Sequence, residues 1–381
     1  MLKSINRLAE KVESTFSKHS GASDIVIVKH ADGELRTTPW FVHCDGQIQP
    51  HDTRVQVRVC IGGKGTELFM SVGRDHQCSF HPSDLDAAAA SYLPSESQLQ
   101  MLPLVPGKNE AVFEVRQLEE NTQRWSVQSA IEANIFLWEA TDRVVAFDYE
   151  GALLRSDAWA KEAKEAMLGT KKATEWDGKD KSGMHDGVGS LLSSLNHGGY
   201  RILITTNSPI SRMSNRRSAI SAASSAEVDR WGDQAELPDI PVMCGTDHTA
   251  AVLAKKLASK ALAVAGKQGK QNDCKRSSLS LVADLFRIAG SPDSENESGG
   301  GFAGGFCRSE DVEAFVDSGV PVSGIVAVDR FGTSLQVVQQ HGLAQAGWKS
   351  FGEFPAATMF PSLCKSSPGS RDMPSPGVLL L

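Results

Sequence analysis

The ten residues from Arg143 to Ala152, Arg-Val-Val-Ala-Phe-Asp-Tyr-Glu-Gly-Ala, constrain the fold more than any other stretch of this chain. An apolar run ends in Asp148, a second acid follows at Glu150, and Gly151 then permits a turn. This pattern is typical of a buried strand that delivers two carboxylates to the edge of a sheet. The first acid can attack phosphorus and the second can shuttle a proton, so the stretch indicates phosphoryl transfer.

From residue 143 onward, apolar runs alternate with helical patterns. Such alternation is typical of a parallel sheet with helices on both faces, in which ligands bind beyond the carboxyl ends of the strands. The expected strands are 143–148, 200–206, 240–245, 302–307 and 324–329, and the expected helices are 186–196, 249–264, 276–288, 309–317 and 333–341.

The first part of the chain has a different rhythm. Residues 24–82 form short period-two runs separated by turn signals, which predicts strands of a β-sandwich. Residues 87–102 are polar, rich in alanine and weakly patterned, as in a linker. Two further strands are expected at 110–115 and 125–138. The predicted fold class is therefore α/β plus all-β, with the β-domain built from two separated segments.

Two more strands of the expected parallel sheet end in groups that suit phosphoryl transfer. The hydroxyl of Thr206 could hold a phosphate oxygen, and Asp311 follows the strand at 302–307. Separated acids can supply carboxylate oxygens to Mg²⁺, which takes its remaining ligands from water and substrate phosphate. Each group also has a structural interpretation, since Asp148 could merely terminate a strand and Asp311 could serve the first turn of a helix. Their joint occurrence at strand ends favours catalysis.

The composition excludes several classes of protein. A net charge of -7 argues against general nucleic-acid binding, which requires a basic surface. The seven cysteines are scattered without a C-x-x-C pair, which favours free thiols in a reducing compartment. No apolar run is long enough to span a bilayer and no signal peptide is evident, so the expected protein is soluble or peripherally bound.

Residues 2–18 have the pattern of an amphipathic helix with an apolar stripe and cations beside it. Periodicity alone favours a helix packed on its own domain, and the alternative is a helix lying among lipid headgroups. In that alternative the membrane-binding residues are Leu2, Ile5, Leu8, Val12, Phe16, Lys3, Arg7 and Lys11.

Several collinear blocks resemble the lipins, a family of Mg²⁺-dependent phosphatidate phosphatases with a haloacid-dehalogenase-like catalytic domain. The opening stretch is similar to the D-x-D-G-T nucleophile motif of that superfamily. The other blocks are the Ser-Gly-x-x-Asp-Ile-Val-Ile-Val opening at Ser20, Pro39-Trp40-Phe41-Val42, His185-x-Gly187-Val188, Arg308-x-x-Asp311-Val312 and Phe351-Gly352-Glu353. The resemblance implies an immunoglobulin-like domain beside a Rossmann-like phosphatase domain, and it favours membrane contact for the first helix.

The resemblance also implies a role for individual residues. Asp148 matches the nucleophile, Glu150 stands at the acid/base position with its carbonyl available to Mg²⁺, and Asp311 matches the distal Mg²⁺ ligand. Thr206 matches the phosphate-binding residue. Lys270 is the expected charge-stabilising lysine, with Lys267 and Lys275 as alternatives.

Five positions depart from the lipin pattern. Glu150 is one methylene longer than the family's aspartate, and Ala152 replaces a threonine. Asn207-Ser208 stands where lipins have Ala-Arg, which removes an arginine that could contact phosphate, and Cys307 replaces an asparagine. A displacement near 1 Å at a reacting group can cost about a hundredfold in rate. Together these departures predict either a slowed or an inactive site.

The leading expectation is a phosphatidate phosphatase that acts through an aspartyl-phosphate, in the cytoplasm and at membranes, with the endoplasmic reticulum as the expected organelle. The alternatives are a lipin-like protein that binds phosphatidic acid or membranes without hydrolysis, and a phosphatase for another phosphomonoester. The expected segments are the helix at 1–22, the amino-terminal lipin segment at 23–86, the linker at 87–106, the remaining β-strands at 107–141, the catalytic domain at 142–364 and a disordered tail at 365–381.

Overall fold

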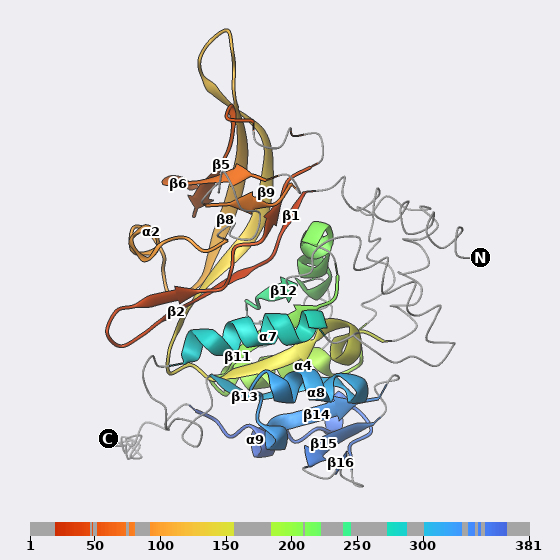
Figure 1. Cartoon of the computed structure of the whole chain (residues 1–381). Helices are drawn as coiled ribbons and strands as arrows, with labels where there is room; N and C mark the ends of the chain where they lie inside the picture. The colour runs from red at the N-terminus through yellow and green to blue at the C-terminus, as the bar shows by residue number, and fades with distance from the viewer. Residues whose placement is uncertain are drawn as a thin grey trace, which may run out of the picture.

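The computed structural model describes residues 20–45, 48, 52–73, 76–80, 92–155, 184–208, 210–221, 239–244, 273–287, 301–329, 334–339, 342–343 and 347–363. They form a mostly parallel α/β module and a separate mixed β-sheet, which lies above it in Figure 1. The expected helices at 2–18 and 249–264 and the expected tail at 365–381 lie outside the described residues. No helix among the described residues has both the length and the apolar character needed to cross a bilayer.

The α/β module is built on a seven-stranded sheet with the order β12-β11-β10-β13-β14-β15-β16. The first five strands of this order are parallel, and β15 and β16 are antiparallel additions at one edge. The strands are β10 (Val144–Asp148), β11 (Arg201–Thr206), β12 (Val242–Cys244), β13 (Phe302–Arg308), β14 (Ile325–Val328), β15 (Leu335–Gln339) and β16 (Gly342–Leu343). The five strands expected from residue 143 onward are confirmed as β10, β11, β12, β13 and β14.

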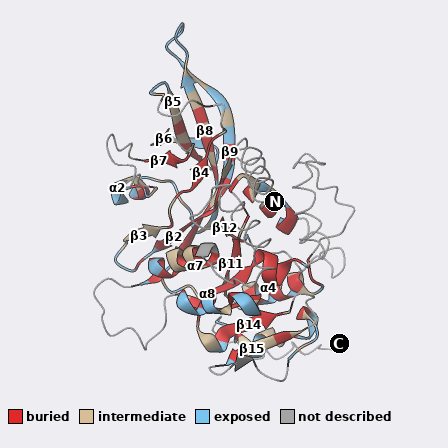
Figure 2. Cartoon of the chain, turned by 45° about the vertical axis from the view of Figure 1, so that its right-hand side comes forward, coloured by how far each residue is buried: buried red, intermediate tan, exposed pale blue. Residues whose placement is uncertain are grey.

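Strand β10 lies between β11 and β13, and all five of its residues are buried. Figure 2 shows buried residues gathered in the middle of this module. Val145 and Phe147 pack in the cluster that contains α4 (Val188–His197), and the Phe147 ring stacks 4.6 Å from that of Phe306. The other face packs against α7 (Asp273–Phe286) and α8 (Val312–Asp317). A strand covered in this way reads as a continuous apolar run, which is the pattern found in the sequence.

The prediction of a helix at 333–341 is wrong, because this region contains strand β15 (Leu335–Gln339). Leu335 pairs with Val328 and Val337 with Val326 in an antiparallel ladder with β14. The segment Leu-Gln-Val-Val-Gln contains two β-branched residues, which fit a half-buried pleated surface. Pairing with a neighbouring strand therefore outweighs a short helical periodicity.

The β module has the strand order β3-β2-β9-β8-β5-β6-β7. Strand β2 runs parallel to β9 and β5 runs antiparallel to β8, so segments from before and after residues 87–106 share one sheet. Its core includes Trp40 and Phe113, whose ring centroids are 6.1 Å apart. The strands are β2 (Ile25–Lys29), β3 (Leu35–Thr37), β5 (Val55–Ile61), β6 (Lys64–Val72), β7 (Cys78–Ser79), β8 (Gly107–Leu118) and β9 (Trp125–Glu139), beside a two-stranded pair of β1 (Gly21–Ala22) and β4 (Val42–His43).

Two short elements lie in segments for which the sequence predicts a different structure. The stretch expected to be a linker contains α2 (Glu96–Gln100), which begins with a capping box between Ser95 and Gln98. Its Leu99 is buried in the core of the β module. The amino-terminal helical segment was expected to reach residue 22, but Gly21–Ala22 form β1. A capping box satisfies helix-end donors within four residues, which is how a short helix forms in a polar segment.

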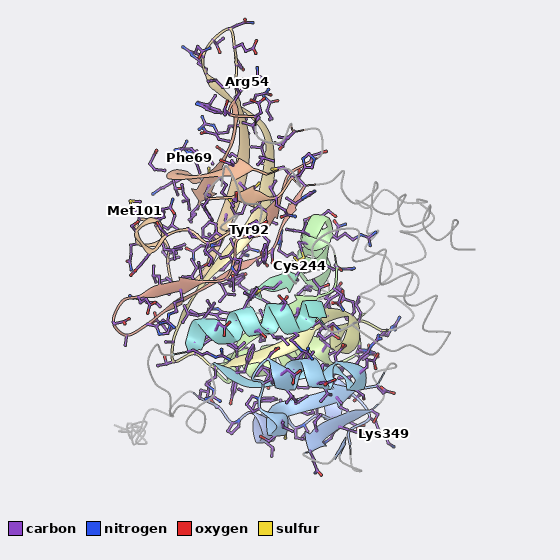
Figure 3. All side chains as sticks on the ribbon, viewed as in Figure 1. Arg54, Phe69, Tyr92, Met101, Cys244 and Lys349 are labelled. Atoms are coloured by element: carbon purple, nitrogen blue, oxygen red, sulfur yellow. The ribbon has the colours of Figure 1, made fainter. Side chains whose placement is uncertain are left out.

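The two modules are joined by the buried carboxylate of Asp24. It accepts hydrogen bonds from the main-chain N–H groups of Asn134 in β9 and Val242 in β12, both at 2.9 Å. Arg217 donates to it at 3.0 Å from the helix at 213–221. Burial raises the pKa of Asp24, and the charge of Arg217 opposes that rise. Figure 3 places Cys244, the last residue of β12, in the same region between the modules.

Candidate active site

Asp148 lies at the carboxyl end of β10 and is completely buried. Its Oδ2 atom accepts a hydrogen bond from Nζ of Lys275 at 2.6 Å. Its Oδ1 atom has no hydrogen-bond partner among the described residues. Burial raises the pKa of Asp148 well above its usual range, while the charge of Lys275 acts in the opposite direction. The site therefore holds a carboxylate that depends on nearby positive charge to remain ionised.

Lys275 links Asp148 to a second buried acid. Its ammonium group, carried by α7, also donates to Oδ2 of Asp311 at 2.6 Å. Asp311 ends the short helix η3 (Ser309–Asp311), which directly follows β13. Burial lowers the pKa of Lys275, but the charges of Asp148, Asp311 and Glu150 outweigh that effect and hold the pKa above its usual range. The structure thus brings together two acids that are 163 positions apart in sequence, counted from Asp148 to Asp311.

The lysine in this position is Lys275, which the sequence interpretation carried as an alternative. The expected lysine, Lys270, and the other alternative, Lys267, lie outside the described residues. Helix α7 begins at Asp273, so Lys275 is in its first turn and its side chain is almost fully buried. A cationic side chain is rarely buried unless it is paired, and here two acids pair with it.

Glu150 and Thr206 also come together, but with different neighbours. Glu150 belongs to the π-helical turn η1 (Tyr149–Leu153), and its carboxylate accepts a hydrogen bond from the Thr206 hydroxyl. The main-chain N–H of Asn207 donates to both carboxylate oxygens at 3.2 and 3.1 Å, and the Ser208 hydroxyl donates at 3.2 Å. We call these three donors, from Thr206, Asn207 and Ser208, the β11 cradle. The Glu150 carboxylate therefore lies in the cradle, at the expected phosphate-binding end of β11.

Two arginines complete the site, and sequence reasoning assigned no role to either. Arg308 donates from Nη2 to the main-chain carbonyl of Glu150 at 2.9 Å. Arg216 donates from Nε to the Ser208 hydroxyl at 2.7 Å, and its guanidinium lies 4.8 Å from the centroid of the Tyr149 ring. Arg308 stands in a quoted family block, which was a usable signal. Arg216 offered none, because only the fold brings it to the cradle.

Gly151 is required by the close approach of the Asp148 side chain. A Cβ atom at position 151 would lie 1.8 Å from Oδ2 of Asp148, the atom that Lys275 contacts. Gly151→Ala is therefore expected to displace that carboxylate and to lower the free energy of unfolding by about 1–3 kcal/mol, the usual cost of forced overpacking. Urea unfolding measures this loss. Gly319→Ala is not a suitable control because its φ is positive. Gly352→Ala is the matched control, because it adds the same methyl group where the nearest atom, Oγ of Ser350, lies 3.8 Å away.

The residues present fit a Mg²⁺ ion. Mg²⁺ prefers oxygen ligands and is usually held by one or two carboxylates, with water and phosphate in the other positions. Asp148 offers a buried oxygen without a partner among the described residues, and Asp311 lies beside it through the shared contact with Lys275. The Glu150 carbonyl, the third expected ligand, already accepts a hydrogen bond from Arg308 in this structure. A carbonyl oxygen has a second lone pair, so this contact still permits coordination.

Two models of known protein families together match nearly the whole chain. The family model described as LNS2 (Lipin/Ned1/Smp2) matches residues 90–361, and the model described as lipin, N-terminal conserved region, matches residues 1–97. Nuclear elongation and deformation protein 1 of Schizosaccharomyces pombe is 27% identical over 163 residues, which are 43% of this chain and 20% of that protein. This match thus spans well under two thirds of the relative's length.

Proposed function

The chain belongs to the lipin family, and on that basis we propose that it is a phosphatidate phosphatase that releases phosphate from phosphatidic acid and leaves diacylglycerol. The observation that carries the proposal is the buried group of Asp148, Lys275 and Asp311 at the carboxyl ends of β10 and β13. Parallel sheets bind ligands at this edge. A carboxylate beside a buried cation suits attack on a phosphoryl group whose charge must be neutralised.

In the proposed reaction, Oδ1 or Oδ2 of Asp148 attacks phosphorus and the bond to the glycerol oxygen breaks, which gives an aspartyl-phosphate. The leaving oxygen takes a proton and departs as the diacylglycerol hydroxyl. Water then attacks the aspartyl-phosphate, loses a proton, and frees both orthophosphate and the Asp148 carboxylate. Lys275 holds the nucleophile in place and offsets the phosphoryl charge. Bound Mg²⁺, held by Asp148 and Asp311, would supply further charge neutralisation and orient the phosphate.

Glu150 is the proposed proton carrier, since it stands at the acid/base position of the family. Its carboxylate is hydrogen-bonded within the β11 cradle, so proton transfer requires it to turn toward the leaving oxygen. Thr206 is proposed to hold a phosphate oxygen once the cradle is available. Both roles involve movement of the same side chain, which favours a slow enzyme over a fast one.

We further propose that the protein acts at the cytoplasmic face of a membrane, with its first helix among the lipid headgroups. Phosphatidic acid is confined to membranes, so its phosphatase must reach a bilayer surface. The proposed membrane contacts are those of the expected helix at 2–18. The mixed sheet, in which two separated segments pair, is proposed to be the immunoglobulin-like domain of the family.

Phosphate release from liposomes that contain phosphatidic acid tests the proposal. The full chain is expected to release phosphate in the presence of Mg²⁺ and to stop when a chelator is added. A soluble phosphomonoester at the same concentration serves as the comparison, and deletion of residues 1–18 should reduce turnover on liposomes alone. No phosphate release from liposomes under any Mg²⁺ concentration would reject the proposal.

One observation favours a second candidate, a lipin-like protein that binds phosphatidic acid without hydrolysing it. Glu150 occupies the cradle with a carboxylate that three donors hold in place. If it never leaves, no group in its position protonates the leaving oxygen. Binding to phosphatidic-acid liposomes without phosphate release would support this candidate.

A further inference from the structure

The donors of the β11 cradle are the kind that bind a phosphoryl oxygen, but here they bind a carboxylate of the protein itself. Two hydroxyls and a main-chain N–H converge on the Glu150 carboxylate from Thr206, Asn207 and Ser208. Hydrogen bonds from such donors to an anion are stronger than those between neutral groups. The cradle is therefore an anion site, and its occupant is tethered two residues after Asp148.

The surroundings of the cradle favour an anion in it. Arg216 is buried at 5% exposure and donates to the Ser208 hydroxyl at 2.7 Å, which orients the hydroxyl hydrogen toward Glu150. The main-chain N–H of Ser208 donates to the Thr206 hydroxyl at 3.0 Å, which orients that hydroxyl in the same way. Each hydroxyl of the cradle thus receives one hydrogen bond and donates another to the carboxylate.

Glu150 is itself buried at 8% exposure, so its charge is not satisfied by bulk water. A buried charge is costly unless it is paired or fully hydrogen-bonded. The hydrogen bonds that its carboxylate accepts from Thr206, Asn207 and Ser208 supply that compensation. A second anion cannot share the same donors, both because the space is filled and because two like charges at contact distance repel.

We infer that Glu150 is an internal competitor for phosphate: its carboxylate occupies the anion site at the end of β11, and a phosphoryl group binds there only after displacing it. The inference deepens the proposed function, on which it rests for the identity of the substrate. Displacement would also free the Glu150 carboxylate at the moment when a phosphoryl group enters. The longer side chain of glutamate thus sets the affinity of the site for phosphate in addition to its proposed role in proton transfer.

Orthophosphate binding to the full chain tests this inference without requiring turnover. We expect Glu150→Ala to bind orthophosphate about tenfold more tightly than the unchanged protein in isothermal titration calorimetry with Mg²⁺ present, because no tethered anion competes. Glu150→Gln keeps the shape and removes the charge, so its affinity should lie between the two. Glu313→Ala, which removes an exposed acid from the first turn of α8, is the matched control and should leave the affinity unchanged.

Thermal unfolding provides the second measurement. Loss of the carboxylate leaves the cradle donors without their partner, so Glu150→Ala should melt at a lower temperature without phosphate. A ligand that binds only the folded state stabilises it by mass action, so added orthophosphate should raise the melting temperature of Glu150→Ala more than that of the unchanged protein. If Glu150→Ala does not fold, Glu150→Gln decides the question by the same two measurements.

Equal orthophosphate affinity in the unchanged protein and in a folded Glu150 variant would overturn the inference. The proposed function fails separately, by the absence of phosphate release from phosphatidic acid. Tighter phosphate binding by Glu150→Ala together with an inert unchanged protein would uphold the inference and reject the proposed function. An active protein with no gain in affinity would do the reverse.

Discussion

Asp148→Asn is expected to abolish Mg²⁺-dependent phosphate release from phosphatidic acid, with a loss of about three orders of magnitude or more. An amide nitrogen and oxygen do not attack phosphorus as a carboxylate does, so no aspartyl-phosphate can form. The substitution preserves the shape of a side chain that is completely buried at the end of β10. The loss should therefore appear in turnover and leave the fold intact, as circular dichroism would verify.

A matched control for this variant lies before the same strand. Asp142 accepts a hydrogen bond from Arg201 at 3.0 Å, whereas the ion pairs of Lys275 are made with Asp148 and Asp311. Asp142→Asn removes the same charge and should retain turnover. Phosphate release that survives Asp148→Asn would place the chemistry on another residue and contradict the proposed mechanism.

Lys275→Met is expected to lower the free energy of unfolding by about 3–5 kcal/mol, the usual cost of removing one partner of a buried ion pair. The side chains of Lys275, Asp148 and Asp311 are 4%, 0% and 8% exposed, so water cannot replace the missing ammonium. Two buried carboxylates would then face each other without an intervening cation. Urea unfolding at neutral pH measures the loss, and the full chain should also lose phosphate release.

The pH dependence of that loss follows from Asp148. Burial raises the pKa of Asp148 and Lys275 opposes the rise, so the pKa should rise further in the variant. A carboxyl group whose pKa is higher in the folded state than in the unfolded state destabilises the fold as the pH rises toward that higher value. The reason is that ionisation is less favourable in the folded state. The deficit of Lys275→Met should therefore shrink as the pH falls into the acidic range.

The neighbouring residue supplies the control for Lys275→Met. Arg276 also lies in α7 and pairs with Asp317 at 2.6 Å, but the two side chains are 39% and 45% exposed. Exposed ion pairs contribute about 0–1 kcal/mol, so Arg276→Met should cost no more than that. Equal losses in the two variants would contradict the view that the buried pairings of Lys275 stabilise the fold.

The elements that the sequence predicts well are those whose pattern is local and strong. Strands β10, β11 and β13 are continuous apolar runs that end in polar groups, and this signal survives because both faces of a parallel sheet are buried. The lipin resemblance is confirmed, because it depended on collinear blocks spread along the chain. The α/β class and the separate β-sheet are confirmed with it.

The errors arise where tertiary contacts outweigh a short pattern. Strand β15 forms because it pairs antiparallel with β14, and the sequence of residues 335–339 does not by itself indicate that pairing. Helix α2 has only five residues, and it forms in the expected linker because a capping box and the burial of Leu99 stabilise it. Segments of this length carry too few residues for periodicity to decide between helix, strand and loop.

By itself, the sequence determined the family, the positions of the central strands along the chain, and the placement of Asp148, Glu150, Thr206 and Asp311 at or just after strand ends. Only the tertiary structure decided which groups meet there. Folding places Lys275 between the carboxylates of Asp148 and Asp311, and it brings Arg216 to the β11 cradle. It also places the Glu150 carboxylate within hydrogen-bonding distance of the donors at the end of β11. The physical reason is that strand ends follow from local apolar patterns, whereas the partners of buried charges come from distant segments that folding places around them.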